Sequence, residues 1–194
     1  MEIETAKEQR VLEAAKAVFL RHGFRRVTMQ DIAAEAGISR PALYLIFPNK
    51  EEVFLATIRD ITRQSLRVLR ERIGDHPTPE AQLQFAFEIW FVQPFELLLG
   101  APDAKDLFDC TQGFAKPTMD QVTAGFESLL EEILVPLIGS SAGAPVRFQA
   151  GQVAHLLNSA VHGFKSSSAT PDELRAQISA MIALITTALR AQTS

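Results

Sequence analysis

The sequence contains a single cysteine, Cys110, among its 194 residues. One cysteine excludes an internal disulfide and any zinc site built on paired cysteines, and a free thiol is typical of a reducing compartment. No stretch approaches the ~20 apolar residues that a membrane-spanning helix needs. The first ten residues are rich in Glu and Lys and lack the apolar centre of a signal peptide. These absences predict a cytoplasmic protein with no membrane partner.

A strong net charge is also missing, since the chain carries only −4 at pH 7. The charge is nevertheless uneven along the chain. Residues 1–50 hold eight Lys and Arg against six Asp and Glu, whereas residues 51–194 hold eleven against seventeen. The N-terminal quarter is therefore slightly basic and the remainder is acidic, which suggests where a nucleic acid would bind without establishing that one does.

Helical periodicity dominates the sequence, and no segment alternates as a convincing strand would. We predict an all-α fold of about nine helices. Four are expected at 5–22, from Thr28, from Ser39 and from Asn49 to Ile73, followed by five at 80–99, 103–112, 118–138, 146–165 and 171–191. The fourth would span ~36 Å, enough to join a small N-terminal head to a larger body.

Residues that begin or interrupt helices support these bounds. Thr28 and Asp31 have the spacing of a capping box, and so do Thr170 and Glu173. Pro94 should kink or break the helix at 80–99, because proline has no N–H to donate. No flexible linker is visible, so we expect two domains that share the fourth helix, one at 1–50 and a helical body at 51–194.

Residues 24–55 have the pattern of helix, tight turn and helix. Ala33 is small where two helices must approach closely, and Gly37 can adopt the left-handed conformation that the turn needs. Leu43 and Phe47 should anchor the second helix from below. The residues left on its outer side, short enough overall for the helix to enter a major groove, are Arg40, Pro41, Ala42, Tyr44 and Leu45. The pattern predicts a helix-turn-helix that binds duplex DNA.

Seventeen positions between Gly23 and Glu51 follow a fixed spacing: Gly23-Phe24, Thr28, Asp31-Ile32-Ala33, Ala36-Gly37-Ile38-Ser39, Ala42-Leu43-Tyr44, Phe47 and Asn49-Lys50-Glu51. They resemble the TetR family of bacterial transcriptional regulators over about residues 10–55. The resemblance implies a homodimer that binds a pseudo-palindromic DNA operator through residues 1–50. It also implies that residues 51–194 dimerise and bind a small-molecule effector, which releases the repressor from DNA.

The resemblance also assigns contacts by position. Phosphate contacts would come from Thr28, Ser39, Tyr44 and Lys50, and base-edge or groove contacts from Arg40, Pro41, Ala42 and Leu45. Thr28 and Ser39 can equally be plain N-caps. One position departs from the family: Ile46 stands where many members have a His or Tyr that contacts phosphate. Arg25 and Arg26 could compensate, or they could be a solvated surface pair.

Aromatic residues are concentrated in the body. Phe87, Trp90, Phe91, Phe95, Phe108 and Phe126 are candidates for the wall of a pocket that binds an unknown apolar or amphipathic molecule. The alternative interpretation is ordinary hydrophobic core. Interruption of the helix at Pro94 would free space and backbone groups beside them.

The last two helices are candidates for a two-fold, four-helix dimer interface, because one is strongly one-sided and the other carries small residues. The interface residues predicted from these stripes are Val153, Leu157, Ala160, Val161, Ile178, Met181, Ile182, Ile185 and Leu189. A role confined to the core of one subunit is the alternative.

Two other functions compete with a ligand-responsive repressor. A DNA-binding structural protein without an inducer would have a fully packed body. An enzyme would need a nucleophile–base pair, metal-ligand spacing or a phosphate-binding glycine loop, and the sequence shows none of these. We therefore expect no catalysis, no cofactor and no metal.

Overall fold

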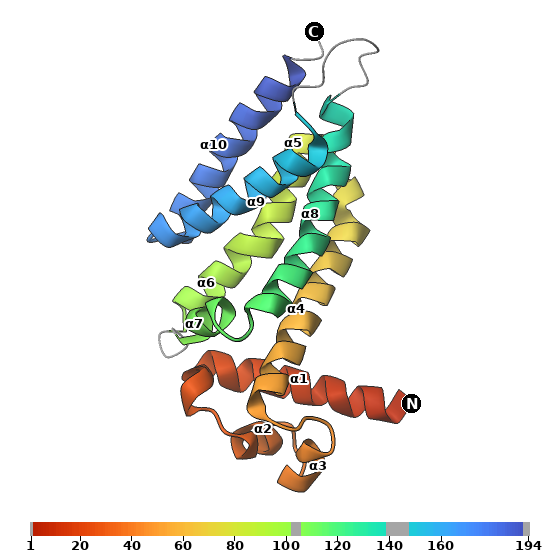
Figure 1. Ribbon diagram of the computed structural model, residues 1–194, viewed down its shortest axis with the longest axis vertical. Coiled ribbons are helices and arrows are strands. Elements are labelled where there is room, and N and C mark those ends of the chain that lie inside the picture. The colour runs from red at the N-terminus through yellow and green to blue at the C-terminus, as the bar shows by residue number, and fades with distance from the viewer. Residues whose placement is uncertain (1, 102–105, 139–147, 192–194) are drawn as a thin grey trace. The chain divides into compact units, whose positions relative to one another are not determined.

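The computed structural model describes residues 2–101, 106–138 and 148–191, and every regular element among them is helical (Figure 1). The helices are α1 (Glu2–Arg26), α2 (Met29–Glu35), α3 (Arg40–Tyr44), α4 (Lys50–Arg72), α5 (Pro79–Phe87), α6 (Gln93–Leu99), α7 (Asp106–Gln112), α8 (Lys116–Ile138), α9 (Ala150–Ser167) and α10 (Pro171–Arg190). The prediction of an all-α fold is confirmed. Of the described helices, none is long and apolar enough to cross a membrane.

Contacts divide the chain into two units. The first comprises Met1–Gln64 and Leu98–Val122, and the second comprises Ser65–Leu97 and Thr123–Ser194. Helices α4 and α8 each contribute residues to both units. This division differs from the predicted boundary at residue 50, because α7 and the beginnings of α4 and α8 pack with the N-terminal helices.

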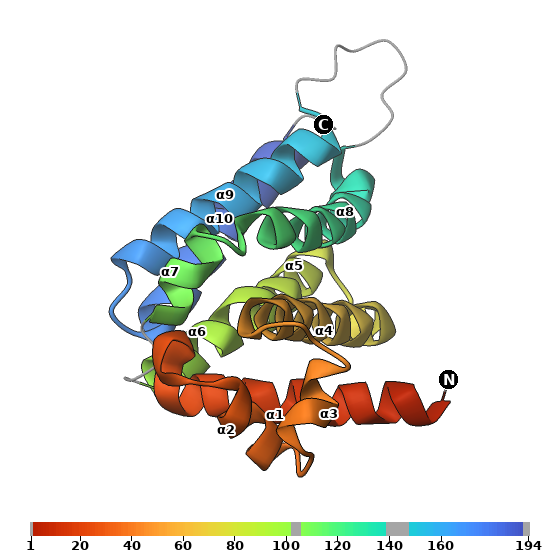
Figure 2. The ribbon, with the colours of Figure 1, turned by 60° about the horizontal axis from the view of Figure 1, so that its bottom comes forward.

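The first unit is built around α1. In two views α2 and α3 lie on the same side of α1 (Figures 1 and 2). Its core includes Val11 and Phe19 from α1, Ile32 from α2, Leu43 from α3 and Val53 from α4, all nearly inaccessible to solvent. The short α3 therefore stays in place through burial and capping, since five residues cannot form a stable helix alone.

The second unit has its own core, formed by α5, α6, α8, α9 and α10 together with the end of α4 and the turn between α5 and α6. Fully buried residues from these helices include Phe87, Phe126, Leu134, Leu157 and Ile182. Each helix contributes one apolar stripe, and the stripes meet in a single hydrophobic cluster. Threonines cap two of these helices, since Thr78 accepts from the N–H of Ala81 and Thr170 from that of Glu173.

The helix expected at 80–99 continues through Pro94, but its hydrogen-bond pattern changes just before the proline. A π-helical turn, Glu88–Val92, joins α5 to α6 immediately before the proline, and the N–H of Gln93 bonds to the carbonyl of Glu88. Pro94 has no N–H to donate to the carbonyl four residues before it. In a π turn each N–H bonds to the carbonyl five residues before it, so the helical hydrogen-bond pattern has already shifted by one residue where the proline stands. Taken as one run, α5 to α6 gives nine helices among the described residues, as predicted.

Candidate nucleic-acid interface

The turn between α2 and α3 is fixed by backbone geometry and by one arginine. Gly37 has φ +65°, and its N–H bonds to the carbonyl of Ala34 at 3.1 Å. Nη2 of Arg10, on α1, donates to the carbonyl of Ala36 at 2.9 Å. The prediction that Gly37 adopts the left-handed conformation is confirmed, and α1 holds the turn through a charged hydrogen bond.

Two polar side chains set the starts of α2 and α3. Thr28 Oγ1 accepts from the N–H of Asp31, and Asp31 Oδ2 accepts from the N–H of Thr28 at 2.8 Å. The Thr28 hydroxyl also donates to Asp31 Oδ2 at 2.8 Å, and this bond, together with the one from the Thr28 N–H, lowers the pKa of Asp31. Ser39 Oγ accepts from the N–H of Ala42 at 3.3 Å. The N-cap interpretation of Thr28 and Ser39 is therefore confirmed, and their phosphate contacts remain predictions.

Helix α3 presents a small, mostly exposed surface. Leu43 is fully buried beneath it and Phe47 follows on the same inner side, whereas Arg40, Pro41, Tyr44 and Leu45 face outward and Ala42 is half-buried. Leu45, directly after the last residue of α3, is 88% exposed. The structure thus brings the predicted base-contacting residues together on one helix.

Arg40 and Tyr44 interact one helical turn apart. Arg40 Nη2 donates to the Tyr44 hydroxyl at 3.3 Å, and the Arg40 Cζ atom lies 5.5 Å from the centre of the Tyr44 ring. The ring and its hydroxyl therefore restrict where the guanidinium can go before DNA arrives. The sequence prediction treated these two side chains as independent contacts.

Lys50 makes contacts within the chain that were not predicted, and its phosphate contact remains a prediction. Its Nζ donates to the carbonyls of Phe24 and Val27 at 2.7 and 2.8 Å, and it lies 4.3 Å from the centre of the Phe24 ring. An ammonium has three N–H donors, so two are committed within the chain. Lys50 thus fastens the start of α4 to the connection between α1 and α2, which the resemblance did not reveal.

Ile46 packs half-buried against the core of the first unit and so serves the fold. The arginines considered as its replacement are exposed at the end of α1. Arg25 lies 3.8 Å from Asp109 in a solvent-exposed ion pair, which leaves its guanidinium accessible. A compensating contact from Arg25 or Arg26 therefore remains a prediction.

The aromatic residues of the second unit form a closely packed group. Trp90 stacks on Phe126 with ring centres 4.6 Å apart and planes 3° from parallel, and Phe87 and Phe91 approach Phe126 edge-on. Phe95 is also buried in this core. The prediction for Phe108 is wrong: it lies in α7, within the first unit, and is 46% exposed. Sequence proximity could not reveal that α7 packs with the N-terminal helices.

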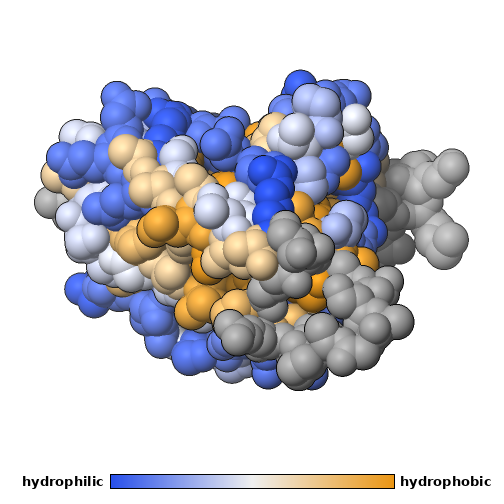
Figure 3. Space-filling view, turned by 90° about the horizontal axis from the view of Figure 1, so that it is seen from above, coloured by the Kyte–Doolittle hydropathy of each residue, from blue (hydrophilic) through white to orange (hydrophobic). Residues whose placement is uncertain are grey.

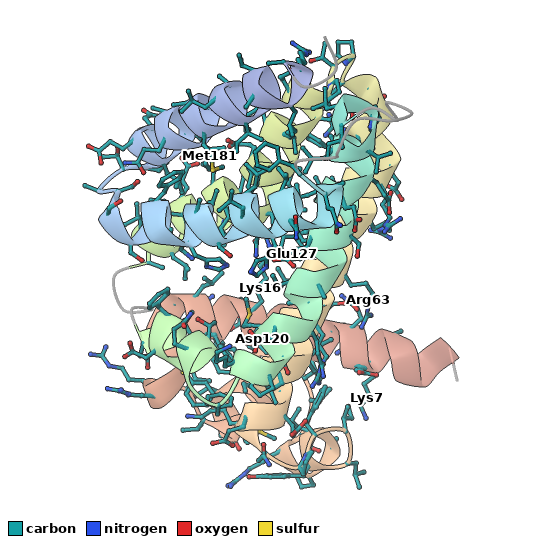
Figure 4. The ribbon with its side chains drawn as sticks, turned by 45° about the horizontal axis from the view of Figure 1, so that its top comes forward. Lys7, Lys16, Arg63, Asp120, Glu127 and Met181 are labelled. Carbon is teal, nitrogen blue, oxygen red and sulfur yellow. The ribbon has the colours of Figure 1, made fainter. Side chains whose placement is uncertain are left out.

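The predicted dimer residues are also corrected. Val153, Leu157, Val161, Ile178, Ile182 and Leu189 are buried in the core of their own subunit and cannot meet a partner. Ala160, Met181 and Ile185 are half-buried, and Met181 extends from α10 toward this core (Figure 4). The apolar stripe was real, but it faces inward, as in the alternative interpretation.

Polar contacts within the second unit were not predicted. Glu127 extends from α8 toward α9 (Figure 4), where its Oε1 lies within 2.9 Å of Asn158 Nδ2 and 3.0 Å of His155 Nδ1. Arg175 on α10 donates two hydrogen bonds to Glu88 beside a hollow of about 360 Å³ between α5 and α10. Residues so far apart in sequence offered no spacing from which either contact could be read.

The described geometry defines an all-helical protein with a helix-turn-helix in its first unit. Residues 11–57 match the family described as "Bacterial regulatory proteins, tetR family". The predicted resemblance of the N-terminal region to the TetR family is therefore confirmed.

Curated relatives match parts of the chain. The HTH-type transcriptional regulator YfiR of Bacillus subtilis is 38% identical over 40% of this chain and 37% of its own length. The HTH-type transcriptional regulator RutR of Escherichia coli is 28% identical over 66% of this chain and 58% of its own length. The chain therefore spans less than two thirds of either relative.

Solved structures match nearly the whole chain. A transcriptional regulator from Pseudomonas aeruginosa PAO1 is similar with a TM-score of 0.70 and 21% identity, over 95% of this chain and 92% of that one. A transcriptional regulator from Saccharomonospora viridis, solved in complex with choline, has a TM-score of 0.70 and 18% identity, over 92% and 96%. At these identities the likeness extends to the fold alone.

Proposed function

We propose that this protein is a transcriptional regulator that binds duplex DNA by sequence through α3. The observation that carries the proposal is the outward surface of α3, where an arginine, an exposed tyrosine and an exposed leucine stand on a capped, rigidly held helix. Such a helix fits a major groove, where an arginine can recognise guanine. The match of residues 11–57 to the family supports the same function.

In-vitro selection from a random duplex pool tests this proposal with the full chain. We expect enrichment of a pseudo-palindrome, because two copies related by a two-fold axis would read two half-sites. The affinity for the selected duplex should fall steeply with salt while its preference over random DNA persists. Enrichment of no sequence at any salt concentration would refute sequence-specific binding.

The protein acts, in this proposal, as a homodimer that uses the outer faces of α9 and α10. The two helices lie side by side (Figures 1 and 2), and apolar residues are visible in the middle of the molecule seen from above (Figure 3). No Asp, Glu, Lys or Arg occurs between residues 150–164 of α9 or between 176–189 of α10. Leu156 and Leu184 project from these helices at 57% and 73% exposure among small residues. A charge-free surface of this kind suits close helix packing across a two-fold axis.

Leu184→Glu should separate the dimer. A carboxylate at the centre of an isologous interface would be buried against its own copy, so like charges would meet without compensation. We expect sedimentation to show a monomer at micromolar concentration, together with weaker operator binding. Val135→Glu is the control, since Val135 is also an exposed apolar residue but lies on α8. Dissociation by both variants, or by neither, would contradict this choice of interface.

We also propose that a small apolar or amphipathic molecule releases the regulator from DNA by binding beside Trp90 and Phe126. The aromatic walls support this, and the choline complex of the Saccharomonospora viridis regulator makes a small quaternary ammonium ion a suitable probe. The tight stacking of Trp90 on Phe126 favours a second candidate, a DNA-binding protein that responds to no ligand. In that case the aromatic group serves only as core.

A ligand screen distinguishes these candidates. Binding should change the fluorescence of Trp90, the only tryptophan, and raise Tm, because a ligand at 100 times its Kd stabilises by about 2.7 kcal/mol. The same molecule should release the selected operator. Arg175→Ala is the control, since Arg175 lines the hollow between α5 and α10 and is not part of the Trp90–Phe126 stack. A broad apolar and cationic library without any such response would favour the second candidate.

A further inference from the structure

The connection between α1 and α2 runs from Gly23 to Thr28 and includes the last turn of α1. It contains an unusual feature, because the helix is interrupted at Gly23 and then resumes. Gly23 has φ 75° and ψ 169°, and the helical turn continues from Phe24 to Arg26. The first N–H groups after such an interruption have no carbonyl within the helix to receive them. They must find acceptors elsewhere or in water.

Asp106, from the first turn of α7, supplies these acceptors. Its Oδ1 accepts from the N–H of Phe24 at 2.9 Å, and its Oδ2 accepts from the N–H of Arg25 at 2.7 Å. One carboxylate thus holds two consecutive peptides from a residue more than eighty positions away. Hydrogen bonds to an ionised acceptor are about twice as strong as neutral ones.

The same connection is held on its carbonyl side. Lys50 donates to the carbonyls of Phe24 and Val27, and the Phe24 ring packs against Phe54 and Phe114 with ring centres 5.2 Å apart in both pairs. The peptides from Phe24 to Val27 therefore lie between a carboxylate on α7 and an ammonium on α4. Thr28, which caps α2, follows directly.

We infer that Asp106 is a positioning residue for DNA binding, which fixes from α7 the point where α2 begins. The inference rests on the proposed function. Helix α2 packs against α3, so a shift at the start of α2 would move the surface that carries Arg40. Asp106 touches no DNA in this scheme. It also explains in part why α7, distant in sequence, belongs to the first unit.

Long-range electrostatics alone predicts the opposite change in DNA affinity for a variant without the Asp106 charge, so the direction of the change distinguishes the two explanations. Removing a carboxylate from a DNA-binding unit reduces repulsion of phosphates and should strengthen binding. We expect Asp106→Asn to weaken binding of the selected operator about tenfold, as when a binding-competent arrangement falls to a tenth of its population. Asparagine has one acceptor oxygen and would set its NH₂ against the second N–H.

Asp109→Asn is the matched control. It removes the same charge one turn further along α7, where the side chain is exposed and forms an ion pair with Arg25 at 3.8 Å. We expect its affinity to equal or exceed that of the wild type. Both variants are compared at a temperature where each is fully folded, and a role in stability alone would lower Tm without weakening binding there. The salt dependence of Asp106→Asn should match the wild type, because no phosphate contact is lost.

Amide hydrogen exchange without DNA supplies the second readout. In Asp106→Asn the amides of Phe24 and Arg25 should exchange faster, and the effect should extend into α2 but not into α9. Unchanged exchange at these amides, or operator binding as tight as in Asp109→Asn, would overturn the inference. If the wild type selects no duplex, the proposed function fails, and exchange alone then decides whether Asp106 holds the connection.

Discussion

Lys50→Met should destabilise the protein by about 2–3 kcal/mol, since hydrogen bonds to charged groups contribute roughly 1.5–3 kcal/mol and their loss leaves acceptors unpaired. Methionine keeps most of the stem but cannot donate to the carbonyls of Phe24 and Val27, 2.7 and 2.8 Å from Nζ. For a domain of this size the loss corresponds to a fall in Tm of roughly 5–10 °C. Thermal unfolding followed by circular dichroism measures it.

Lys16→Met provides the comparison for this variant. Lys16 is exposed on α1, so the same loss of charge and the same methionine should change stability by less than about 0.5 kcal/mol. Equal Tm values for the two variants would show that the Lys50 bonds add nothing to the fold. A phosphate contact by Lys50 would show itself separately, as a salt dependence of operator binding reduced by about one unit.

Local sequence signals predicted the elements of the first unit because their causes are local. A capping box needs only Thr28 and Asp31 at a fixed spacing, and the turn needs a residue such as Gly37 that tolerates positive φ. Structure confirmed these features where sequence placed them. The hydrogen bonds from Lys50 to backbone carbonyls could not be predicted, because these carbonyls come within reach only after α1 and α4 have packed.

The sequence predicted that helices of the second unit have one apolar side, but it could not predict what that side faces. Ile178 and Ile182 mark a stripe on α10, and a stripe is equally compatible with the subunit core and with a subunit interface. The structure turns it inward, so the candidate interface becomes the opposite face, where Leu184 stands among alanines and threonines. Small residues give a weak sequence signal, because they are common on exposed helices as well. The assignment of Phe108 to the pocket wall was wrong for a related reason, since nothing in the local sequence indicates which unit α7 joins.

Arg40→Ala should cost about 1–3 kcal/mol on the selected operator and relax preference at one base pair in each half-site. Arg40 stands at the first position of α3, the end of a recognition helix that contacts base edges. Its planar fork matches O6 and N7 of guanine, whereas Ala42 and Leu45 offer only apolar contact. Affinities for the operator and for a duplex changed at that base pair are measured for each variant.

Arg40→Lys separates direct readout from charge. Lysine retains the positive charge but loses the bidentate fork, so it should keep affinity for random DNA while discriminating less between the two duplexes. If Arg40→Ala weakens binding of both duplexes equally, Arg40 contacts a phosphate and not a base, and sequence specificity must come from DNA shape.

Tyr44→Phe completes a double-mutant cycle on the same surface. The hydroxyl that accepts from Arg40 is lost, but the ring beneath the guanidinium remains. If the hydroxyl acts by orienting Arg40, its removal should reduce discrimination in the presence of Arg40 and have no such effect after Arg40→Ala. If Tyr44 instead contacts phosphate on its own, its cost should be equal for both duplexes and additive with that of Arg40→Ala. A coupling free energy above about 0.5 kcal/mol, confined to the preferred operator, would show that the two side chains read DNA as one unit.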